Sequence, residues 1–226
     1  MNFIYDGSFE GFLSALEKAV KVKDSTISKD NLLFNENIAI KDNDSDKTFS
    51  KNLYFDLLIL YLSETKDFEN IALNYAKLNE KERKNINNEH IRKVYEIKRK
   101  YFRELHKFKG LTRFYEIDEN LLFSKIAPDN NILIFLAEHF KKRVKENFII
   151  YDEKRNIGAI RNQNDIFLQE LKDEDIKFYK TRKEQEINNL WKKFFNEIAI
   201  KERINYKLQR NFVPLKYRKN ITEFIT

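Results

Sequence analysis

The residues that could carry out catalytic chemistry in this 226-residue chain do not form a known catalytic motif. Its three histidines, His90, His106 and His139, include neither an HExxH motif nor two histidines at the spacing of helical metal ligands, so a histidine-based metal site is not expected. The acidic residues between Asp129 and Glu153 lack the spacing of a two-metal nuclease or a glycosidase pair. No serine lies in a GxSxG motif. The sequence therefore predicts no metal site and no nucleophile, and it leaves any catalytic residue unknown.

A small cationic pocket is the arrangement that these side chains do permit. His139 and Arg143 are four residues apart in a segment predicted to be helical, so we expect them on one face of the helix. If that face looks over the neighbouring strand, Arg113 joins them, and the pocket could hold a phosphate or a flipped nucleotide. The arginines would then lower the pKa of His139. The alternative is that His139 and Arg143 face solvent or pair with local carboxylates. The candidate pocket residues are His106, Arg113, Asp129, His139 and Arg143.

A second candidate site is the basic stretch near the end of the sequence. Between Lys192 and Lys219, nine Lys and Arg residues stand against two Glu residues, a local charge of +7 that equals the net charge of the whole chain. Aromatic residues are interleaved with these cations, as in surfaces that grip phosphates and stack on exposed bases. The alternative is a solvated amphipathic helix with a basic tail. The candidate nucleic-acid-binding residues are Arg203, Asn205, Lys207, Arg210, Lys216, Tyr217 and Arg218.

The composition limits the class of protein. With 42% apolar and 14% aromatic residues the chain is expected to be globular, and four Gly and two Pro favour long helices over Gly-rich phosphate loops. The chain has no cysteine, so it can supply neither an iron–sulfur cluster nor a disulfide, and any redox chemistry would belong to a partner. No apolar run approaches 18 residues and no signal segment is apparent, so we expect a cytoplasmic protein without a membrane span.

The hydrophobic periodicity predicts an α+β fold in one domain, residues 1–226. Residues 1–110 are expected to be mainly helical after a short strand, with Ser8 as the cap of the first helix, a buried helix near residues 49–62 and a long helix near residues 88–107. That long helix and its exit carry a second basic cluster. Gly110 is expected to end it.

Residues 111–171 change to short β-branched and aromatic runs, which predict a small antiparallel sheet of four or five strands interrupted by one helix. The helix is expected to begin near Asp129 or Asn130, after Pro128. Residues 172–226 are expected to form the C-terminal helical, basic part of the domain, beginning with a long charged helix. Its apolar stripe is expected to dock on the body of the protein. The stripe comprises Leu190, Trp191, Phe194, Phe195 and Ile198.

Four motifs together resemble a known bacterial family. They are YDGSFEGFLSALEKA near the start, HKFKGLTRFYEI, then PDNNILIFLAEHFKKR followed by IYDEKRNIGA, and WKKFFNEIAIKERINYKLQRNFVPLKYRKNITEF at the end. The family is a domain of unknown function described as DNA metabolism or DNA repair proteins, usually encoded beside a radical-SAM protein and sometimes fused to a uracil-DNA glycosylase domain. The resemblance covers essentially the whole chain. It implies a role on DNA with a radical-SAM partner, and it supplies no catalytic residue.

Three functions follow as expectations. In the first, the chain is an accessory subunit that binds DNA or another nucleic acid for a radical-SAM partner, which holds the iron–sulfur cluster and S-adenosylmethionine. In the second, it is a glycosylase-like or nuclease-like DNA-processing enzyme that uses the pocket residues. In the third, it is a scaffold whose basic tail binds an acidic protein.

Overall fold

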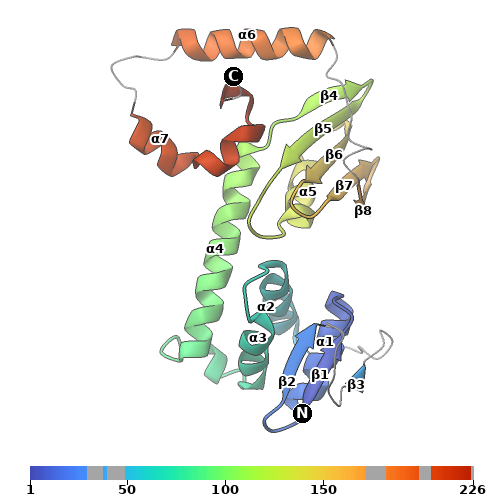
Figure 1. Ribbon diagram of the computed structural model, residues 1–226, viewed down its shortest axis with the longest axis vertical. Coiled ribbons are helices and arrows are strands. Elements are labelled where there is room, and N and C mark those ends of the chain that lie inside the picture. Colours follow the sequence, from blue (N-terminus) through green and yellow to red (C-terminus); the bar gives the residue numbers. More distant parts are fainter. Residues whose placement is uncertain (30–37, 40–48, 172–181, 199–204, 225–226) are drawn as a thin grey trace. The chain divides into compact units, whose positions relative to one another are not determined.

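The computed structural model describes residues 1–29, 38–39, 49–171, 182–198 and 205–224 (Figure 1). The chain divides into two compact units, Met1–Phe102 and Arg103–Thr226, and helix α4 contributes residues to both. The fold is α+β, as predicted. The expectation of a single domain stays a prediction. Among the described residues, no helix is both long and apolar enough to cross a membrane.

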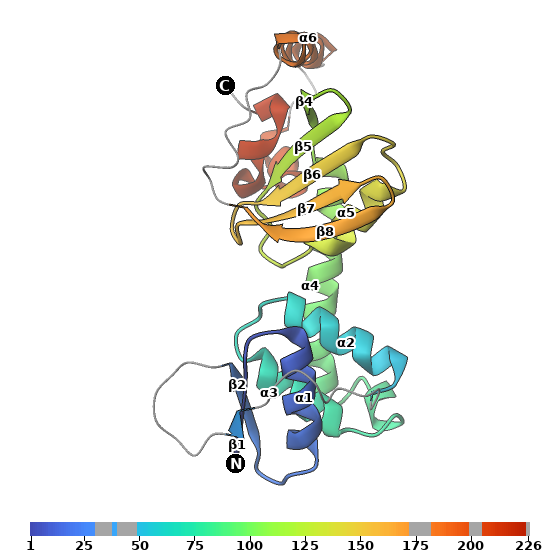
Figure 2. The ribbon, with the colours of Figure 1, turned by 90° about the vertical axis from the view of Figure 1, so that its right-hand side faces the viewer.

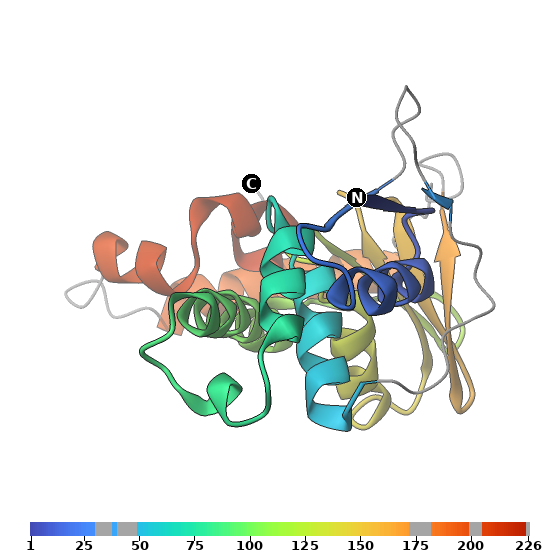
Figure 3. The same ribbon diagram turned by 90° about the horizontal axis from the view of Figure 1, so that it is seen from below.

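Unit 1 contains a small parallel sheet with helices packed on it. Strand β1 lies between β2 and β3 and pairs with both in parallel, and α1 contacts both β1 and β2 (Figures 2 and 3). The strands are β1 (Asn2–Tyr5), β2 (Thr26–Lys29) and β3 (Ile38–Ala39). The helices are α1 (Phe9–Val20), α2 (Lys51–Leu62), α3 (Phe68–Lys77), the 3-10 helix η1 (Glu82–Lys84) and α4 (Glu89–Leu111).

The first helix begins where the sequence predicted. Ser8 is its N-cap, and the Ser8 hydroxyl accepts a hydrogen bond from the Gly11 amide at 2.9 Å. The apolar stripe of α1 then buries Phe12, Leu16 and Ala19 fully in the core of unit 1. The predicted buried helix is also confirmed as α2, whereas α4 continues through Gly110 and ends one residue later.

Unit 2 is built on a five-stranded sheet in the order β4-β5-β6-β7-β8 (Figure 2). Its strands are β4 (Tyr115–Asp118), β5 (Leu121–Ile126), β6 (Asn147–Asp152), β7 (Ile157–Asn162) and β8 (Asp165–Glu170). Its helices after α4 are α5 (Leu133–Lys141), α6 (Arg182–Ile198), α7 (Tyr206–Phe212), η4 (Leu215–Asn220) and η5 (Thr222–Phe224).

The prediction of a purely antiparallel sheet is wrong at one pair of strands. β5 and β6 run in parallel, with Leu121 opposite Asn147 and Ile126 opposite Asp152, while the other neighbours are antiparallel. The inserted helix α5 explains the difference, because a connection between parallel strands must return the chain to the edge where the first strand began. Helix α5 contacts β6, β7 and β8, and it buries Leu136 and Phe140.

Candidate nucleic-acid interface

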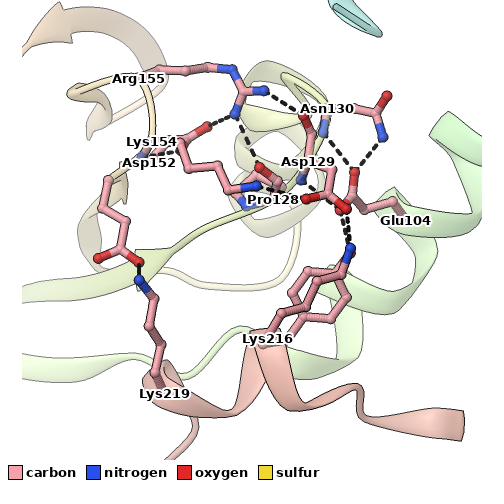
Figure 4. Close-up of polar contacts among 11 residues, drawn as sticks. Glu104, Pro128, Asp129, Asn130, Asp152, Lys154, Arg155, Lys216 and Lys219 are labelled. Atoms are coloured by element: carbon pink, nitrogen blue, oxygen red, sulfur yellow. Dashed lines mark hydrogen bonds and ion pairs between the residues drawn. The ribbon is translucent and has the colours of Figure 1, made fainter. Parts of the chain in front are cut away.

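The carboxyl ends of β5 and β6 meet at one edge of the sheet because these two strands are parallel. Residues 127–132 follow β5 at this edge, and the turn at residues 153–156 follows β6. In sheets with parallel strands, this is the edge at which functional groups commonly collect. Several charged side chains meet here, and they link the loop after β5 to α4 and to the C-terminal segment (Figure 4).

Glu104 of α4 is the centre of these contacts. Its side chain is buried, and its two oxygens accept hydrogen bonds from the main-chain amides of Asp129 and Asn130, both at 2.8 Å. The Asn130 side-chain amide and the Tyr217 hydroxyl also donate to it, each at 2.5 Å. Four donors therefore compensate the cost of burying this carboxylate and fix the loop after β5.

Arg155 binds carbonyl groups of the same loop. The Arg155 guanidinium donates to the carbonyl oxygen of Asp129 at 2.8 Å, and it pairs at 2.7 Å with the carboxylate of Asp152, which is fully buried at the end of β6 (Figure 4). A planar guanidinium suits this double role because its donors point in fixed directions. Glu104 thus binds the amide groups of this loop, and Arg155 binds its carbonyl groups.

The carboxylate of Asp129 projects from this loop between two lysines. Lys154 pairs with it at 2.7 Å, and Lys216 of η4 pairs with its other oxygen. Partial burial opposes ionisation, but the hydrogen bonds from the two lysines outweigh it, so the pKa of Asp129 lies below its usual value. Asp129 is consequently ionised near neutral pH and is a poor general acid there.

Two further ion pairs attach the C-terminal segment to the rest of unit 2. Lys219 pairs with Glu153, which also accepts from Lys125 at 3.0 Å, and Glu223 pairs with Arg113 at 3.0 Å. These cations lower the pKa of both glutamates despite their partial burial. We refer to the contacts of Lys216, Tyr217, Lys219 and Glu223 with the rest of unit 2 as the C-terminal clasp.

The clasp accounts for some of the residues predicted to bind nucleic acid. Tyr217 is buried, and burial together with the nearby Glu104 carboxylate raises its pKa, so its hydroxyl stays a donor. Arg218 donates to the carbonyl oxygen of Val213 at 3.0 Å and lies over the Phe224 ring, 4.4 Å from its centroid. These residues bind within the chain, although the Lys216 side chain remains 53% exposed. Arg203 lies outside the described residues.

Helix α7 presents the rest of the predicted tail to solvent. Asn205 caps this helix by accepting from the Leu208 amide at 2.9 Å. Lys207 and Arg210 are exposed, and no ion pair to either is described. The rings of Tyr206 and Phe212 are 67% and 68% exposed. Two exposed cations therefore lie between two exposed rings along a single short helix.

The residues of the predicted cationic pocket have different neighbours in the structure. Arg113 contacts Glu223 and the Gly110 carbonyl oxygen, and Asp129 lies between its two lysines. His106 is exposed on α4. These contacts join Asp129 to the tail residues Lys216 and Tyr217, which the sequence assigned to a separate site.

His139 and Arg143 do not share a helix face, because α5 ends at Lys141 and Arg143 lies beyond the C-cap. Arg143 is exposed. His139 is half-buried, and its pKa is lowered, as expected. The main cause is burial, however, and Lys109 and Arg143 add smaller effects.

Helix α6 differs from its prediction. Leu190, Trp191 and Phe194 are 66%, 44% and 51% exposed, so this part of the stripe is not buried as predicted, although α6 contacts η5 and Trp191 hydrogen-bonds with Glu223. Ile187 is 49% exposed on the same side of the helix, at the i, i+3, i+4 and i+7 spacing of one face. The first nine residues of the predicted charged helix, 173–181, lie outside the described residues.

Sequence reasoning missed Glu104, although a signal for it exists. Tyr101, Leu105 and Phe108 are buried neighbours of Glu104 at helical spacing. A carboxylate on the apolar side of a helix needs hydrogen-bond donors from elsewhere in the chain. Among the described residues, no group of three or more His, Asp or Glu side chains could hold a metal ion.

Comparisons with other proteins give a family and no further relative. No curated protein and no solved structure matches this chain. One family model, the domain of unknown function DUF4130, matches residues 57–223, which include every residue of the clasp and the exposed helices α6 and α7. The chain therefore belongs to the DUF4130 family.

Proposed function

We propose that this chain is an accessory subunit that binds nucleic acid, with DNA as the expected ligand, for a radical-SAM partner. The observation that supports this proposal most directly is that α7 exposes two cations between two exposed rings. Lysine and arginine bind phosphates without reading sequence, and tyrosine and phenylalanine stack on unpaired bases. The preferred ligand is therefore a single strand, or a duplex with displaced bases.

The C-terminal clasp supports the same proposal indirectly. Lys216, Tyr217 and Lys219 attach η4 to the loop after β5 and to β6, and η4 follows α7 by only a few residues. A short helix of seven residues would hardly be stable alone. The clasp thus limits the positions available to α7 and to its phosphate-binding side chains.

The test is the salt dependence of binding to a single-stranded oligonucleotide. Replacing both Lys207 and Arg210 with Ala should lower the slope of log K against log salt by about 1.4, since each lost single-strand phosphate contact contributes about 0.7. The matched control is the double variant Lys21→Ala and Lys93→Ala, which removes two exposed lysines that form i,i+4 ion pairs. An equal loss in both variants would mean that net charge, and no site on α7, causes binding.

The rings give a separate measurement. Tyr206→Ala and Phe212→Ala should each weaken single-strand binding by about 1–3 kcal/mol if a base stacks on the ring, with little effect on a fully paired duplex. Equal effects on both ligands would argue against stacking.

A protein-binding role is the second candidate, and the exposed stripe on α6 favours it. Large apolar side chains spaced along one helix face commonly bind in an apolar groove of another protein. In our proposal this groove belongs to the radical-SAM partner, and the absence of cysteine from this chain agrees with placing the iron–sulfur cluster there. The DNA-processing alternative gains no such support, because its carboxylate candidate, Asp129, is ionised and held by two lysines.

A further inference from the structure

A pocket of about 160 Å³ lies within unit 1, far in sequence from α7 and the clasp. The first turn of α2 contributes Ser50 and Asn52, helix α3 contributes Tyr75, and η1 contributes Arg83. Pockets for drug-sized ligands are larger, at roughly 300–1,000 Å³. This pocket has room for a small ion or a single chemical group.

Arg83 gives the pocket its chemical character. Its guanidinium carbon lies 5.9 Å from the centroid of the Tyr75 ring, which packs against one side of it. Its Nη1 nitrogen is enclosed, and no acceptor for it is present among the residues that the structure describes. An enclosed donor on a permanently charged group is costly unless an acceptor reaches it, so it favours an anionic ligand.

The carboxylate nearest to this ring does not neutralise Arg83. Asp56 accepts the Tyr75 hydroxyl hydrogen bond at 2.7 Å with one oxygen and pairs with Lys98 through the other. Burial and this hydrogen bond raise the pKa of Tyr75, so its hydroxyl remains a donor to Asp56. The charge of Asp56 is thus matched by Lys98 and leaves the charge of Arg83 available.

The remaining lining residues favour an anion on balance. Glu80 and Lys84 line the pocket with opposite charges and are both exposed. The first turn of α2, a helix of 12 residues, contains no acidic residue. The helix dipole adds positive potential at the pocket, although the Leu53 amide already donates to the Ser50 hydroxyl. The lining carboxylates Asp56 and Glu80 equal the lining cations Arg83 and Lys84 in number, but Asp56 also pairs with Lys98, which adds one positive charge beside the pocket.

We propose that the Arg83 pocket is an oxyanion site that binds one phosphate group. Arginine donates two parallel hydrogen bonds to such a group, and the N-terminus of α2 adds positive potential beside it. The group could belong to free phosphate or to the terminal phosphate of a nucleotide or oligonucleotide, since all share this chemistry. The inference is independent of nucleic-acid binding by α7.

The experiment is a titration of the full chain with inorganic phosphate at constant ionic strength, followed by calorimetry or by amide shifts of unit 1. Arg83→Ala should weaken phosphate binding roughly tenfold or more, the loss expected for a charge-assisted hydrogen bond. Arg83→Lys keeps the charge without the paired donors and should bind with intermediate affinity. Arg92→Ala, at an exposed arginine of α4 in the same unit, is the matched control and should bind normally.

Asn52→Asp keeps the test decisive if the Arg83 variants fold poorly. An aspartate in the first turn of α2 should stabilise the helix through its dipole, yet its charge should repel phosphate from the pocket. Loss of phosphate binding in this variant supports the proposal. Unchanged binding in both Asn52→Asp and Arg83→Ala, or no saturable binding by the natural chain, would overturn it.

Competition identifies the source of the phosphate group. A 5′-phosphorylated oligonucleotide that displaces inorganic phosphate, where its 5′-hydroxyl counterpart does not, would assign the pocket to terminal phosphates. If neither oligonucleotide displaces inorganic phosphate, the pocket is assigned to free phosphate or small phosphate esters. The Lys207 and Arg210 variants should leave phosphate binding unchanged, so the two proposals can fail separately.

Discussion

Glu104 shows how one buried carboxylate can determine the position of distant segments. It accepts hydrogen bonds from the loop after β5 and from Tyr217, which lies 113 residues later in the sequence. Removing this side chain would leave two main-chain amides and the Tyr217 hydroxyl without their acceptor. Unsatisfied buried donors of this kind are among the costliest single changes in a protein.

We therefore expect Glu104→Ala to lower the free energy of unfolding of the natural chain by roughly 3 kcal/mol. Urea denaturation followed by circular dichroism measures this change. The control is Glu96→Ala, an exposed glutamate on the same helix, which should change stability by less than about 0.5 kcal/mol. Similar values for the two variants would show that the Glu104 contacts contribute little.

The lowered pKa values of Asp129, Glu153 and Glu223 predict how stability depends on pH. A carboxyl group whose pKa is lower in the folded chain stabilises the fold above its ordinary pKa, about 4, and this stabilisation is lost as the pH falls through the folded value. The urea concentration at the unfolding midpoint should thus decrease as the pH is lowered from 5 to 3, in part because the clasp loses its ion pairs.

Lys216→Met tests the part played by Asp129 in this acid transition. The variant removes one of the two lysines that lower the pKa of Asp129, so its midpoint should depend less steeply on pH. Identical pH profiles for the variant and the natural chain would exclude a contribution from this pair.

At the level of the elements, α6 exposes large apolar side chains along one face, although it also contacts η5. Trp191 is the single tryptophan of the chain, and it lies 44% exposed in the stripe with Leu190 and Phe194. Its fluorescence should be readily quenched by acrylamide in the isolated chain. Binding of the proposed radical-SAM partner should protect it, if that partner covers α6.

Substitution locates the contact. Phe194→Ala should weaken co-purification with that partner, whereas Lys193→Ala, at an exposed neighbour of Phe194, should not. If the Phe194→Ala variant binds the partner with full affinity and Trp191 is still protected from acrylamide, the contact does not depend on Phe194 and lies elsewhere.

The elements show what the sequence could and could not predict. Periodicity predicted α1 and α4, because each buries one apolar face, and apolar runs predicted α2 and the strands of unit 2, although β8 is largely exposed. Strand direction is not encoded in that period, so the parallel pair β5 and β6 was missed. An apolar stripe likewise shows that α6 has a face suited for burial, but not which molecule covers it.

The same limit applies to the candidate site. Asp129, Lys216 and Tyr217 were nominated from their local surroundings, but for two different sites, because sequence spacing does not show that η4 lies against β5. The ion pairs that occupy Lys216 and Lys219 are contacts between distant segments. The exposed residues of α7 could be nominated from their own sequence, because they take part in no such long-range contact among the described residues.

At the scale of the molecule, the chain has two compact units with buried residues of their own. Leu57 is fully buried in unit 1, and Leu136 is fully buried in unit 2. Each Leu→Ala substitution should cost about 2–5 kcal/mol. The two substitutions can show whether the loss of stability is limited to the unit that contains the substituted leucine.

We expect Leu57→Ala to accelerate hydrogen exchange of the amides of α1 and α2 more than that of β5 and β6, and Leu136→Ala to do the reverse. Exchange resolved by residue or by peptide measures this directly. Equal acceleration throughout the chain in both variants would show one cooperative domain instead.

The long sequence separations within the clasp also determine when it can form. Its contacts join residues 87, 110 and 113 positions apart, so α4 and β5 leave the ribosome well before their partners in η4 and η5. Until those residues are synthesised, Glu104 lacks Tyr217 and Asp129 lacks Lys216. Closing such long loops is slow compared with forming helices or hairpins. The surface that presents α7 is therefore completed after the sheet of unit 2, and a nascent chain would acquire its proposed nucleic-acid interface only then.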